Sequence, residues 1–341
     1  MTGASGFIGS HVCAQLAGQG GEVRAFCRSE PPPAARAAEW VPGDVTDRDA
    51  VVRAVEGCQA VVHSAALYSY ARRDAAAMTE VNVQGTRHVL AAASARRLRV
   101  LVTSTSGTCG PVPGRPATEL DAPSAWELRV PYKRTKVAAE RLALEAARGG
   151  ADVLCVNPTT VLGAGDRRPT PSGAMIRNLL EGRITGYVRG AGLNVAAVED
   201  VARGHALALG RGRAGERYIL GGEDLWLDQV FAAALAVVGR RPPRLALPWP
   251  LVYAAAVGFD ALMRTLGREP GLLVLDEVRL ARLPLFFSSD KARRELGYVP
   301  APAQPALAAA ARWFAPSGRS SSRTRSAASG SASIRSRGGA F

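Results

Sequence analysis

The amino-acid sequence predicts an α/β protein, a doubly wound parallel sheet with a smaller, mostly C-terminal lobe. Three observations lead to this class. Short apolar runs alternate with helix-like stretches through residues 1–160, which is typical of parallel strands covered by helices. A glycine-rich turn at the start runs directly into a helical pattern. The chain has 341 residues, of which 47% are hydrophobic and 21% charged, so it can bury the core of a two-lobed protein.

The elements of the first lobe follow in chain order. The predicted strands are residues 23–27, 60–63, 100–104 and 153–157. Two helices are predicted from apolar residues on one face, the first with Ile8, Val12 and Leu16 and the second with Val51, Val52 and Val55. Two further helices are predicted at residues 78–96 and 132–148. The last of these ends at Gly149 and Gly150.

The first strand of such a sheet is nearly absent. In this fold that strand is central, has a neighbour on both sides and delivers the chain into the glycine turn. Only Met1 precedes the turn that opens at Thr2. We therefore read the first strand as truncated and expect further residues of the Val, Ile or Leu type upstream of Met1.

The second lobe begins where prolines multiply, beyond Pro158. We expect a strand at 218–220 and helices at 224–238 and 250–266. The apolar stretch 245–263 contains Pro248, Pro250 and Asp260. It is therefore interpreted as a buried helix with its approach loop and not as a transmembrane segment.

Three regions follow from this pattern. Residues 1–157 form the first domain, and residues 158–315 form mainly the second lobe. Residues 316–341 are rich in Ser, Arg, Gly and Ala, a composition that buries too little to order itself, so we expect a disordered tail there.

The net charge of +14 does not by itself indicate nucleic-acid binding. Residues 316–341 hold five arginines and no acid, and among the 43 basic residues only three are lysines, which reads as a coding bias toward arginine. Basic and aromatic residues do not interleave, and there is no finger spacing. We expect an ordinary solvated surface and no specific nucleic-acid partner.

The cysteines and the N-terminus bear on location. Five cysteines are scattered without a CxxC spacing, which argues against a zinc site and a disulfide framework and fits a reducing cytoplasm. The start lacks a basic region followed by an apolar core, so no secretory signal is visible. We expect a cytoplasmic protein with no metal site.

The opening residues TGASGFIGSHV form a candidate phosphate-binding turn. Gly3 permits the tight turn, Gly6 lets the backbone approach a pyrophosphate, and Gly9 lets the helix pack close to the sheet. The phosphates would accept from free N–H groups at the positive end of the helix. A plain glycine turn is the alternative. The remaining candidate cofactor contacts in this turn are Ser5, Phe7 and Ile8.

Residues after the next strands indicate which dinucleotide would bind. At the strand end where NAD-binding proteins carry an acid, this chain has Arg28, and a guanidinium suits a 2′-phosphate, so NADP is favoured over NAD. A surface arginine is the alternative. Asp44, followed by Val45, could accept from the adenine amino group or cap a helix near Asp47. The small residues Ala65 and Ala66 would let the cofactor lie against the sheet edge.

The most specific pattern is Tyr132 and Lys136, which share one helix face at i and i+4. A phenol titrates near pH 10, and a nearby cation would bring its pKa toward neutrality. A chance pair on a solvated helix is the alternative. The stretch 103–106 supplies hydroxyls ahead of Tyr132, one of which could hold a substrate oxygen for proton transfer or only form a turn.

The glycine turn, the hydroxyls at 103–106 and the pair Tyr132 and Lys136 follow one another in a characteristic order. In this respect the sequence resembles the extended short-chain dehydrogenase/reductases, also called the NAD-dependent epimerase/dehydratase family, over residues 2–315. The resemblance implies that 1–157 is an NAD(P)-binding Rossmann domain and that segments near 193–210 and 286–300 return to it. Aligning Gly110 with the family's glycine makes Thr105 the catalytic hydroxyl, with Ser104 and Ser106 as fallbacks. The other matching stretches are NVQGT (82–86), NPTTVLG (157–163, with Pro158 at the cofactor) and VEDVA (198–202).

Within the family, three stretches most resemble hopanoid-associated sugar epimerases and dihydroflavonol 4-reductase-like reductases. They are GDRRPTPSG (165–173), ERYILGGEDL (216–225) and FFSSDKARRELGY (286–298). This resemblance implies hydride transfer between NADP or NAD and a secondary alcohol or ketone. Tyr132 would be the general acid/base, Lys136 its pKa tuner and cofactor anchor, and Thr105 the substrate orienter.

Several alternatives stay open. The chain could be a 3β-hydroxysteroid or sterol dehydrogenase-like oxidoreductase, since residues 245–266 are apolar enough to face such a substrate, or a non-catalytic NAD(P)-binding sensor. The expected partner is a small molecule, with a homodimer left open. A nucleotide-sugar diphosphate, or only water, would meet the arginines Arg167, Arg168, Arg183 and Arg189.

Overall fold

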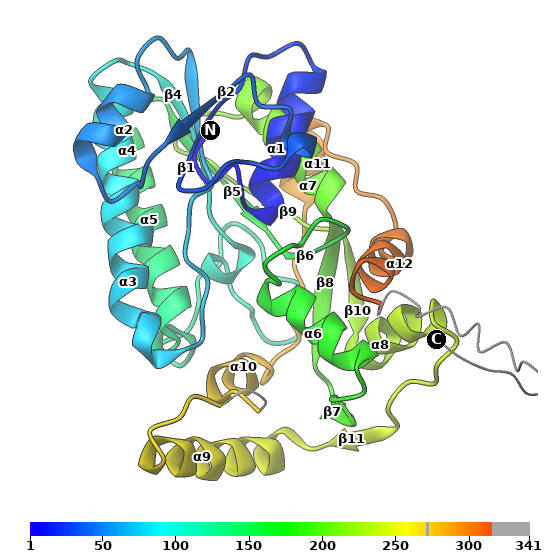
Figure 1. Cartoon of the computed structure of the whole chain (residues 1–341). Helices are drawn as coiled ribbons and strands as arrows, with labels where there is room; N and C mark the ends of the chain where they lie inside the picture. Colours follow the sequence, from blue (N-terminus) through cyan, green and yellow to red (C-terminus); the bar gives the residue numbers. More distant parts are fainter. Residues whose placement is uncertain (271–272, 316–341) are drawn as a thin grey trace, which may run out of the picture.

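The strands of the first lobe form one parallel sheet in the computed structural model, which describes residues 1–270 and 273–315 (Figure 1). Strand β1 (Arg24–Cys27) pairs with β2 (Glu39–Pro42). On the other side β3 (Ala60–His63), β4 (Arg99–Thr103), β5 (Val153–Pro158) and β9 (Arg217–Leu220) pair in that order, all parallel. The predicted strands and the predicted fold class are confirmed.

Met1 and Thr2 lie between β1 and β3, where the first strand was expected. Phe26 donates to Met1 O (2.8 Å), and Thr2 donates to Val62 O (2.9 Å). These two residues therefore join the two sets of strands into the order β2-β1-(1–2)-β3-β4-β5-β9, the doubly wound arrangement. The expectation of residues upstream of Met1 stays a prediction.

Helices cover both faces of this sheet, because successive strand residues point to opposite sides. Leu101 and Leu154 pack under α1 and α7, whereas Val100 and Val153 pack under α2, α4 and α5. On the first face lie α1 (Phe7–Gly18), α7 (Val198–Arg211) and α11 (Asp290–Leu296), and on the second α2 (Arg48–Ala54), α4 (Gly85–Ser94) and α5 (Pro131–Arg148).

The second lobe is built on a three-stranded sheet of β10 (Glu223–Trp226), β8 (Gly192–Ala197) and β6 (Thr160–Leu162). Helices α6 (Pro171–Leu180), α8 (Leu227–Ala236) and α12 (Ala303–Phe314) enclose an apolar core with it. Two short strands, β7 (Gly186–Val188) and β11 (Leu245–Leu247), pair in parallel beside it. Short 3-10 turns occur at Pro33–Ala35, Arg72–Asp74, Ser106–Thr108 and Glu127–Arg129.

Two helix predictions need correction. The predicted helix 224–238 is wrong at its start, because 223–226 pair antiparallel with β8 as β10 and the helix begins only at Leu227. The predicted single helix 78–96 consists of α3 (Ala75–Thr79), a π-helical turn (Glu80–Gln84) and α4. Tertiary strand pairing overrides local helix propensity in the first case.

The predicted helix 250–266 exists as α9 (Trp249–Thr265), but the prediction that it is buried is wrong. Only Ala256 and Asp260 of α9 are buried, because the helix rests on α10 (Leu275–Leu280) and lies outside the main cores. Figure 1 shows both helices at the bottom of the molecule. Within residues 1–270 and 273–315, no helix combines the length and apolar composition that crossing a membrane requires. The predicted tail, 316–341, lies outside the described residues.

Two buried histidines join elements of the first lobe. Burial lowers the pKa of His63 to about 3 and that of His205 to about 4. Thr86 donates its hydroxyl proton to Asn82 O (2.6 Å), so His63 Nε2 donates to Thr86 Oγ1 (3.0 Å) and Nδ1 accepts from Thr2 Oγ1 (2.8 Å). His205 Nδ1 donates to Val201 O (2.7 Å). Both rings are neutral in the fold.

We expect the two buried histidines to lower the free energy of unfolding as the pH drops from about 6.5 toward 4. Glu277, whose pKa burial raises to about 7, acts in the opposite direction, so the histidine contribution is read from the difference between the parent and a histidine variant. In this window the unfolded chain protonates its histidines at their usual pKa of about 6.5 while the folded rings stay neutral, so the unfolded state binds more protons and acid favours it. Urea midpoints at pH 7, 6 and 5 measure the effect. His205→Gln should flatten the decline, because it removes one of the two buried rings. The same decline in His205→Gln would contradict the assignment.

Candidate active site

The carboxyl ends of β3, β4 and β5 meet the starts of α1 and α5 at one cavity of about 180 Å³. Parallel strands present their carboxyl ends at one sheet edge, where such folds bind ligands. The predicted residues Thr105, Tyr132 and Pro158 line this cavity, together with Phe7 and Ile8. Its other lining residues are Tyr68, Tyr70, Ser104, Ser106, Gly107, Lys133, Thr159, Thr160, Val161, Thr170, Ser172, Leu280, Leu285 and Phe287.

The glycine turn lies in backbone-to-backbone contact with its surroundings. Gly3 has a φ of 68°, which favours glycine, and a Cβ there would lie 2.7 Å from Ala65 N. A Cβ on Gly9 would lie 2.1 Å from Gly3 O. Helix α1 begins after Gly6 without a side-chain cap and without an acid in its first turn. The free N–H groups therefore point toward the space where a phosphate would bind.

Thr2 ties this turn to the loop after β3. Its Oγ1 accepts from Ser64 N (3.2 Å) and Ala65 N (3.1 Å) while it donates to His63. The position of the predicted residues Ala65 and Ala66 is thereby fixed relative to Gly3. The sequence prediction missed this role of Thr2, for which a hydroxyl directly before the first glycine was the available signal.

Arg28 and Asp44 lie together at the ends of β1 and β2. Arg28 Nη1 is 3.6 Å from Asp44 Oδ2, and the Arg28 side chain is 69% exposed. Asp44 Oδ1 accepts from Thr46 N (3.0 Å), so this carboxylate closes a local turn, and the helix cap of α2 is Asp47. Val45 is buried in the core below.

Tyr132 and Lys136 occupy the first two turns of α5, as the spacing predicts. Lys136 Nζ donates to Thr103 O (2.8 Å) and is buried. The Tyr132 ring stacks on Tyr68, with centroids 3.8 Å apart. Thr105 begins the 3-10 turn after β4 and accepts from Gly107 N (3.3 Å).

Burial sets the proton affinities of this pair in opposite directions. Burial raises the pKa of Tyr132 far above its usual value, Tyr68 adds to this, and a hydrogen bond with Thr105 acts against it. Burial lowers the pKa of Lys136 to about 8, and Glu140 and Cys155 oppose that shift. At neutral pH the phenol is therefore protonated and the ammonium is close to its titration range.

Polar groups missed by the sequence analysis support this pair. Glu140, one turn beyond Lys136 on α5, is buried and accepts from Thr108 Oγ1 (2.8 Å), Asn157 Nδ2 (2.6 Å) and Arg217 Nη1 (2.8 Å). The i, i+4, i+8 series 132, 136 and 140 was the signal for it. This network links the loop that carries Thr105 to β5 and β9.

Each of the three lysines of the chain has a hydrogen-bond partner in the protein. Lys133 forms a buried ion pair with Glu127 and donates to Gly110 O (2.6 Å). Lys291 donates to Glu216 (2.5 Å) and lies over the Tyr218 ring, with Nζ 4.8 Å from its centroid. Lys133 therefore holds the loop after Thr105 in place and has no free charge to offer a ligand.

The predicted cofactor fits the residues present. The hydroxyls of Ser104 and Thr159 line the cavity and are buried without a hydrogen-bond partner within residues 1–270 and 273–315. Such groups favour the polar part of a bound molecule. Among the described residues, a Cβ on Gly6 would come within 4 Å only of Gly3 O (3.2 Å), so the backbone of Gly6 leaves the close approach that a pyrophosphate needs.

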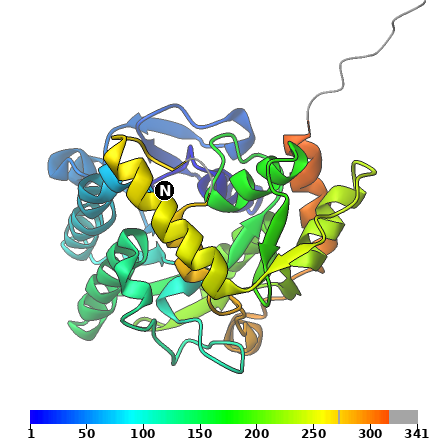
Figure 2. The same ribbon diagram turned by 90° about the horizontal axis from the view of Figure 1, so that it is seen from below.

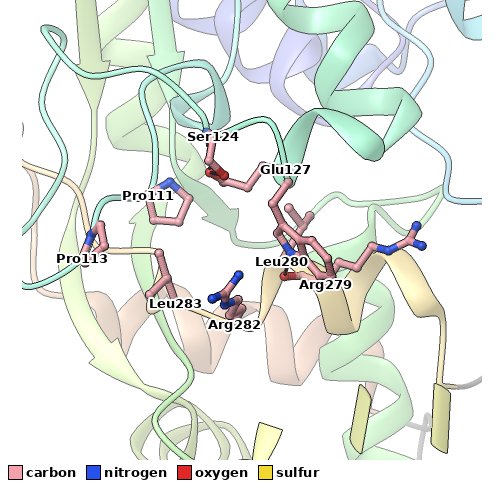
Figure 3. Close-up of a pocket in the computed structure, with 9 residues that line it drawn as sticks. Pro111, Pro113, Ser124, Glu127, Arg279, Leu280, Arg282 and Leu283 are labelled. Carbon is pink, nitrogen blue, oxygen red and sulfur yellow. Dashed lines mark hydrogen bonds between the residues drawn. The ribbon is translucent and has the colours of Figure 1, made fainter. Parts of the chain in front are cut away.

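Figure 3 shows a second cavity of about 230 Å³, next to α10. It shares only Leu280 with the first cavity and holds neither Tyr132 nor Thr105. Its two arginines are engaged, since Arg279 donates to Asp276 (2.7 Å) and Arg282 lies 5.7 Å from the Trp126 ring centroid. The arginines expected to meet a diphosphate are exposed and line neither cavity; they are Arg167, Arg168, Arg183 and Arg189.

Known proteins resemble this chain along most of its length. The model of the NAD dependent epimerase/dehydratase family matches residues 1–221. A protein of Synechocystis sp. named as a dihydroflavonol 4-reductase is 35% identical over 92% of this chain and 93% of the relative. Sterol demethylase protein B of Methylococcus capsulatus is also 35% identical, over 92% of this chain and 97% of the relative. The solved structure of MoeE5 with UDP-glucose and NAD has a TM-score of 0.72 at 26% identity, covering 92% of this chain and 96% of that one.

Gly9→Ala should lower the melting temperature by several degrees and abolish cofactor binding, because the new Cβ meets Gly3 O at 2.1 Å and pushes α1 away from the turn. Gly18→Ala in the same helix is the matched control, since its Cβ meets nothing within 4 Å. That control should be neutral or stabilise by about 0.5–1 kcal/mol. Thermal unfolding and quenching of tryptophan fluorescence by cofactor measure both. Equal behaviour of the two variants would contradict the packing role of Gly9.

Proposed function

Because this chain belongs to the NAD dependent epimerase/dehydratase family, we propose that it is a reductase that transfers a hydride from NADPH to the ketone of an apolar, uncharged substrate. It is an NAD(P)-dependent enzyme of the extended short-chain dehydrogenase/reductase type. The ketone substrate, the preference for NADPH and the roles of the site residues are the proposal.

The residues that line the cavity at Tyr132 support the proposed class of substrate. Apolar side chains form part of the lining, among them Phe7, Leu285 and Phe287, and uncharged Ser, Thr and Tyr hydroxyls form most of the rest. Lys133 is the one cation among the described residues that line it, and it is tied to Glu127. A diphosphate needs free cations or N–H groups, whereas an uncharged ketone needs only a proton donor and a fitting apolar wall.

Tyr132 supplies the proton in this reaction. Bound NADPH provides the hydride. The buried phenol holds its proton at neutral pH, so Tyr132 Oη is the donor to the substrate oxygen, and the Thr105 hydroxyl holds that oxygen in place. Lys136, bonded to Thr103 O, stabilises the phenolate that is left. The stacked Tyr68 ring fixes the orientation of Tyr132 and excludes water from one of its faces.

The relatives point to two substrate classes. One is named for a dihydroflavonol and one for a sterol, both apolar ring systems. MoeE5 was solved with UDP-glucose, so a nucleotide-sugar epimerase is the second candidate, with Arg279 and Arg282 of the neighbouring second cavity as its cations. Epimerisation would return the cofactor unchanged, whereas reduction consumes it.

Substrate assays separate these candidates. We expect sterol ketones and dihydroflavonols to consume NADPH absorbance, and UDP-glucose to give neither NADPH loss nor an epimer by chromatography. Epimerised UDP-glucose without turnover of any apolar ketone would overturn the proposal. Cofactor binding without turnover of either class would identify a sensor.

Tyr132→Phe should lower turnover about 10²–10⁴-fold while folding and cofactor affinity persist, because only the proton donor is lost. Tyr68→Phe is the matched control in the same cavity. It keeps the stacked ring and loses a hydroxyl that bonds only Tyr70 (2.8 Å) among the described residues, so its turnover should stay close to the parent. Steady-state kinetics and cofactor titration measure both variants. A Tyr132→Phe enzyme with turnover like that of Tyr68→Phe would contradict the assignment.

Arg28 is proposed to favour NADPH by pairing with the 2′-phosphate in place of Asp44. Arg28→Ala should narrow the preference for NADPH over NADH by at least about tenfold, since a charge-assisted contact is lost. Arg53→Ala, an exposed arginine on α2, is the control and should leave the ratio unchanged. Fluorescence titration with both cofactors measures the ratio. A preference for NADH in the unmodified protein would overturn this part of the proposal.

A further inference from the structure

One face of α9 is exposed and carries no charge along its whole length. Exposed residues recur at i, i+3, i+4, i+7, i+10, i+11 and i+14 from Leu251. Leu251 is 58% exposed and Leu262 is 52% exposed, and Leu266 just beyond the helix is 56% exposed. The α9 stripe consists of Leu251, Ala254, Ala255, Gly258, Ala261, Leu262 and Thr265. A helix face in contact with water normally carries polar residues, so this stripe needs an apolar partner.

The opposite face of α9 holds the helix in place. Trp249 Nε1 donates to Val278 O (2.8 Å), and the Trp249 ring stacks on Tyr253 with centroids 4.8 Å apart. Asp260 pairs with Arg72 and with Arg264 (2.8 Å). The helix is therefore already packed on its polar and aromatic side, and the stripe faces outward. Figure 2, seen from below, shows α9 lying across the face of the molecule toward the viewer.

The charges around the stripe are positive. Residues 240–269 contain five arginines and two acids, of which Asp260 is buried and Glu269 pairs with Arg72. Arg264 and Arg268 are exposed beside the C-terminal half of the stripe, and Arg241 and Arg244 are exposed ahead of α9. Apolar residues on one face with arginines at its borders are typical of helices that lie in the interface of an anionic membrane.

We propose that α9 binds the surface of an anionic lipid bilayer, with the stripe inserted among the acyl chains and the arginines against the headgroups. The helix lies on the bilayer and does not cross it. A second copy of the chain is a poorer occupant, because pairing two stripes brings arginines from both copies together without an exposed acid in 240–268 to neutralise them.

This position would place the cavity of Tyr132 near the lipid. Leu280 of α10, the helix that supports α9, lines that cavity, and Arg72, which pairs with Asp260, follows the loop of Tyr68 and Tyr70. An apolar substrate could then reach the cavity from the bilayer. This last step rests on the proposed function, whereas binding to the surface does not.

Vesicle flotation of the full chain, without cofactor or substrate, tests the proposal. We expect binding to vesicles of phosphatidylcholine mixed with phosphatidylglycerol, weak binding to phosphatidylcholine alone, and a decline as salt is raised. L251D/L262D should lower the partition coefficient on the mixed vesicles at least about tenfold, because two exposed leucines no longer insert. Leu120→Asp is the control, since Leu120 is 95% exposed elsewhere, and it should bind like the parent.

Both variants keep residues 316–341 with their five arginines, so a loss in L251D/L262D reports the stripe and not the basic segment. Equal binding of L251D/L262D and Leu120→Asp would overturn the proposal. No binding of the unmodified chain to the mixed vesicles would also overturn it, as would a dimer by light scattering that L251D/L262D converts to a monomer. Turnover of an apolar ketone in detergent reports the enzyme activity independently, so the two proposals fail separately.

Discussion

The contact between the backbone of the glycine turn and the loop after β3 is the constraint on which this site depends. Gly3 lies where the backbone of Ala65 leaves no room for a Cβ, and a Cβ on Gly9 would lie even closer to Gly3 O. Thr2 closes this contact with hydrogen bonds to Ser64 and Ala65. Because Met1 and Thr2 also join β1 to β3, the same few residues connect the sheet and shape the turn.

The buried polar groups of the site have hydrogen-bond or charge partners, beginning with the bond between Thr2 and His63. His63 accepts from Thr2 and is neutral, and Glu140 provides a negative charge near Lys136. A lone buried ammonium would be expensive, and a buried carboxylate that is itself bonded to Arg217 lowers that cost. The protonated phenol of Tyr132 therefore lies near two buried cations, Lys133 and Lys136, that have the carboxylates of Glu127 and Glu140 beside them.

Much of the fold could be predicted from local pattern. The glycine turn, each apolar strand and the pair Tyr132 and Lys136 are each encoded by residues that are close together in the sequence. Periodicity and spacing are therefore enough to predict them. The start of β10 could not be found in this way, because its pairing with β8 is made by residues about 30 positions away. The exposure of α9 is likewise decided by which element covers it, and apolar composition alone indicated burial. Asp44 lies near the exposed Arg28 and also closes a local turn by accepting from Thr46 N. The sequence contains no signal that distinguishes these two roles.

Because every lysine has a partner within the protein, the positive charge of the surface comes from arginine. Lys133, Lys136 and Lys291 are paired or buried. The cationic side chains left to solvent are guanidinium groups, which keep their proton up to about pH 12. Enzymatic acetylation, amine-reactive reagents and mildly alkaline conditions therefore have little to act on at the outside of this protein. Its attraction to anions can be screened by salt but not switched off by lysine modification.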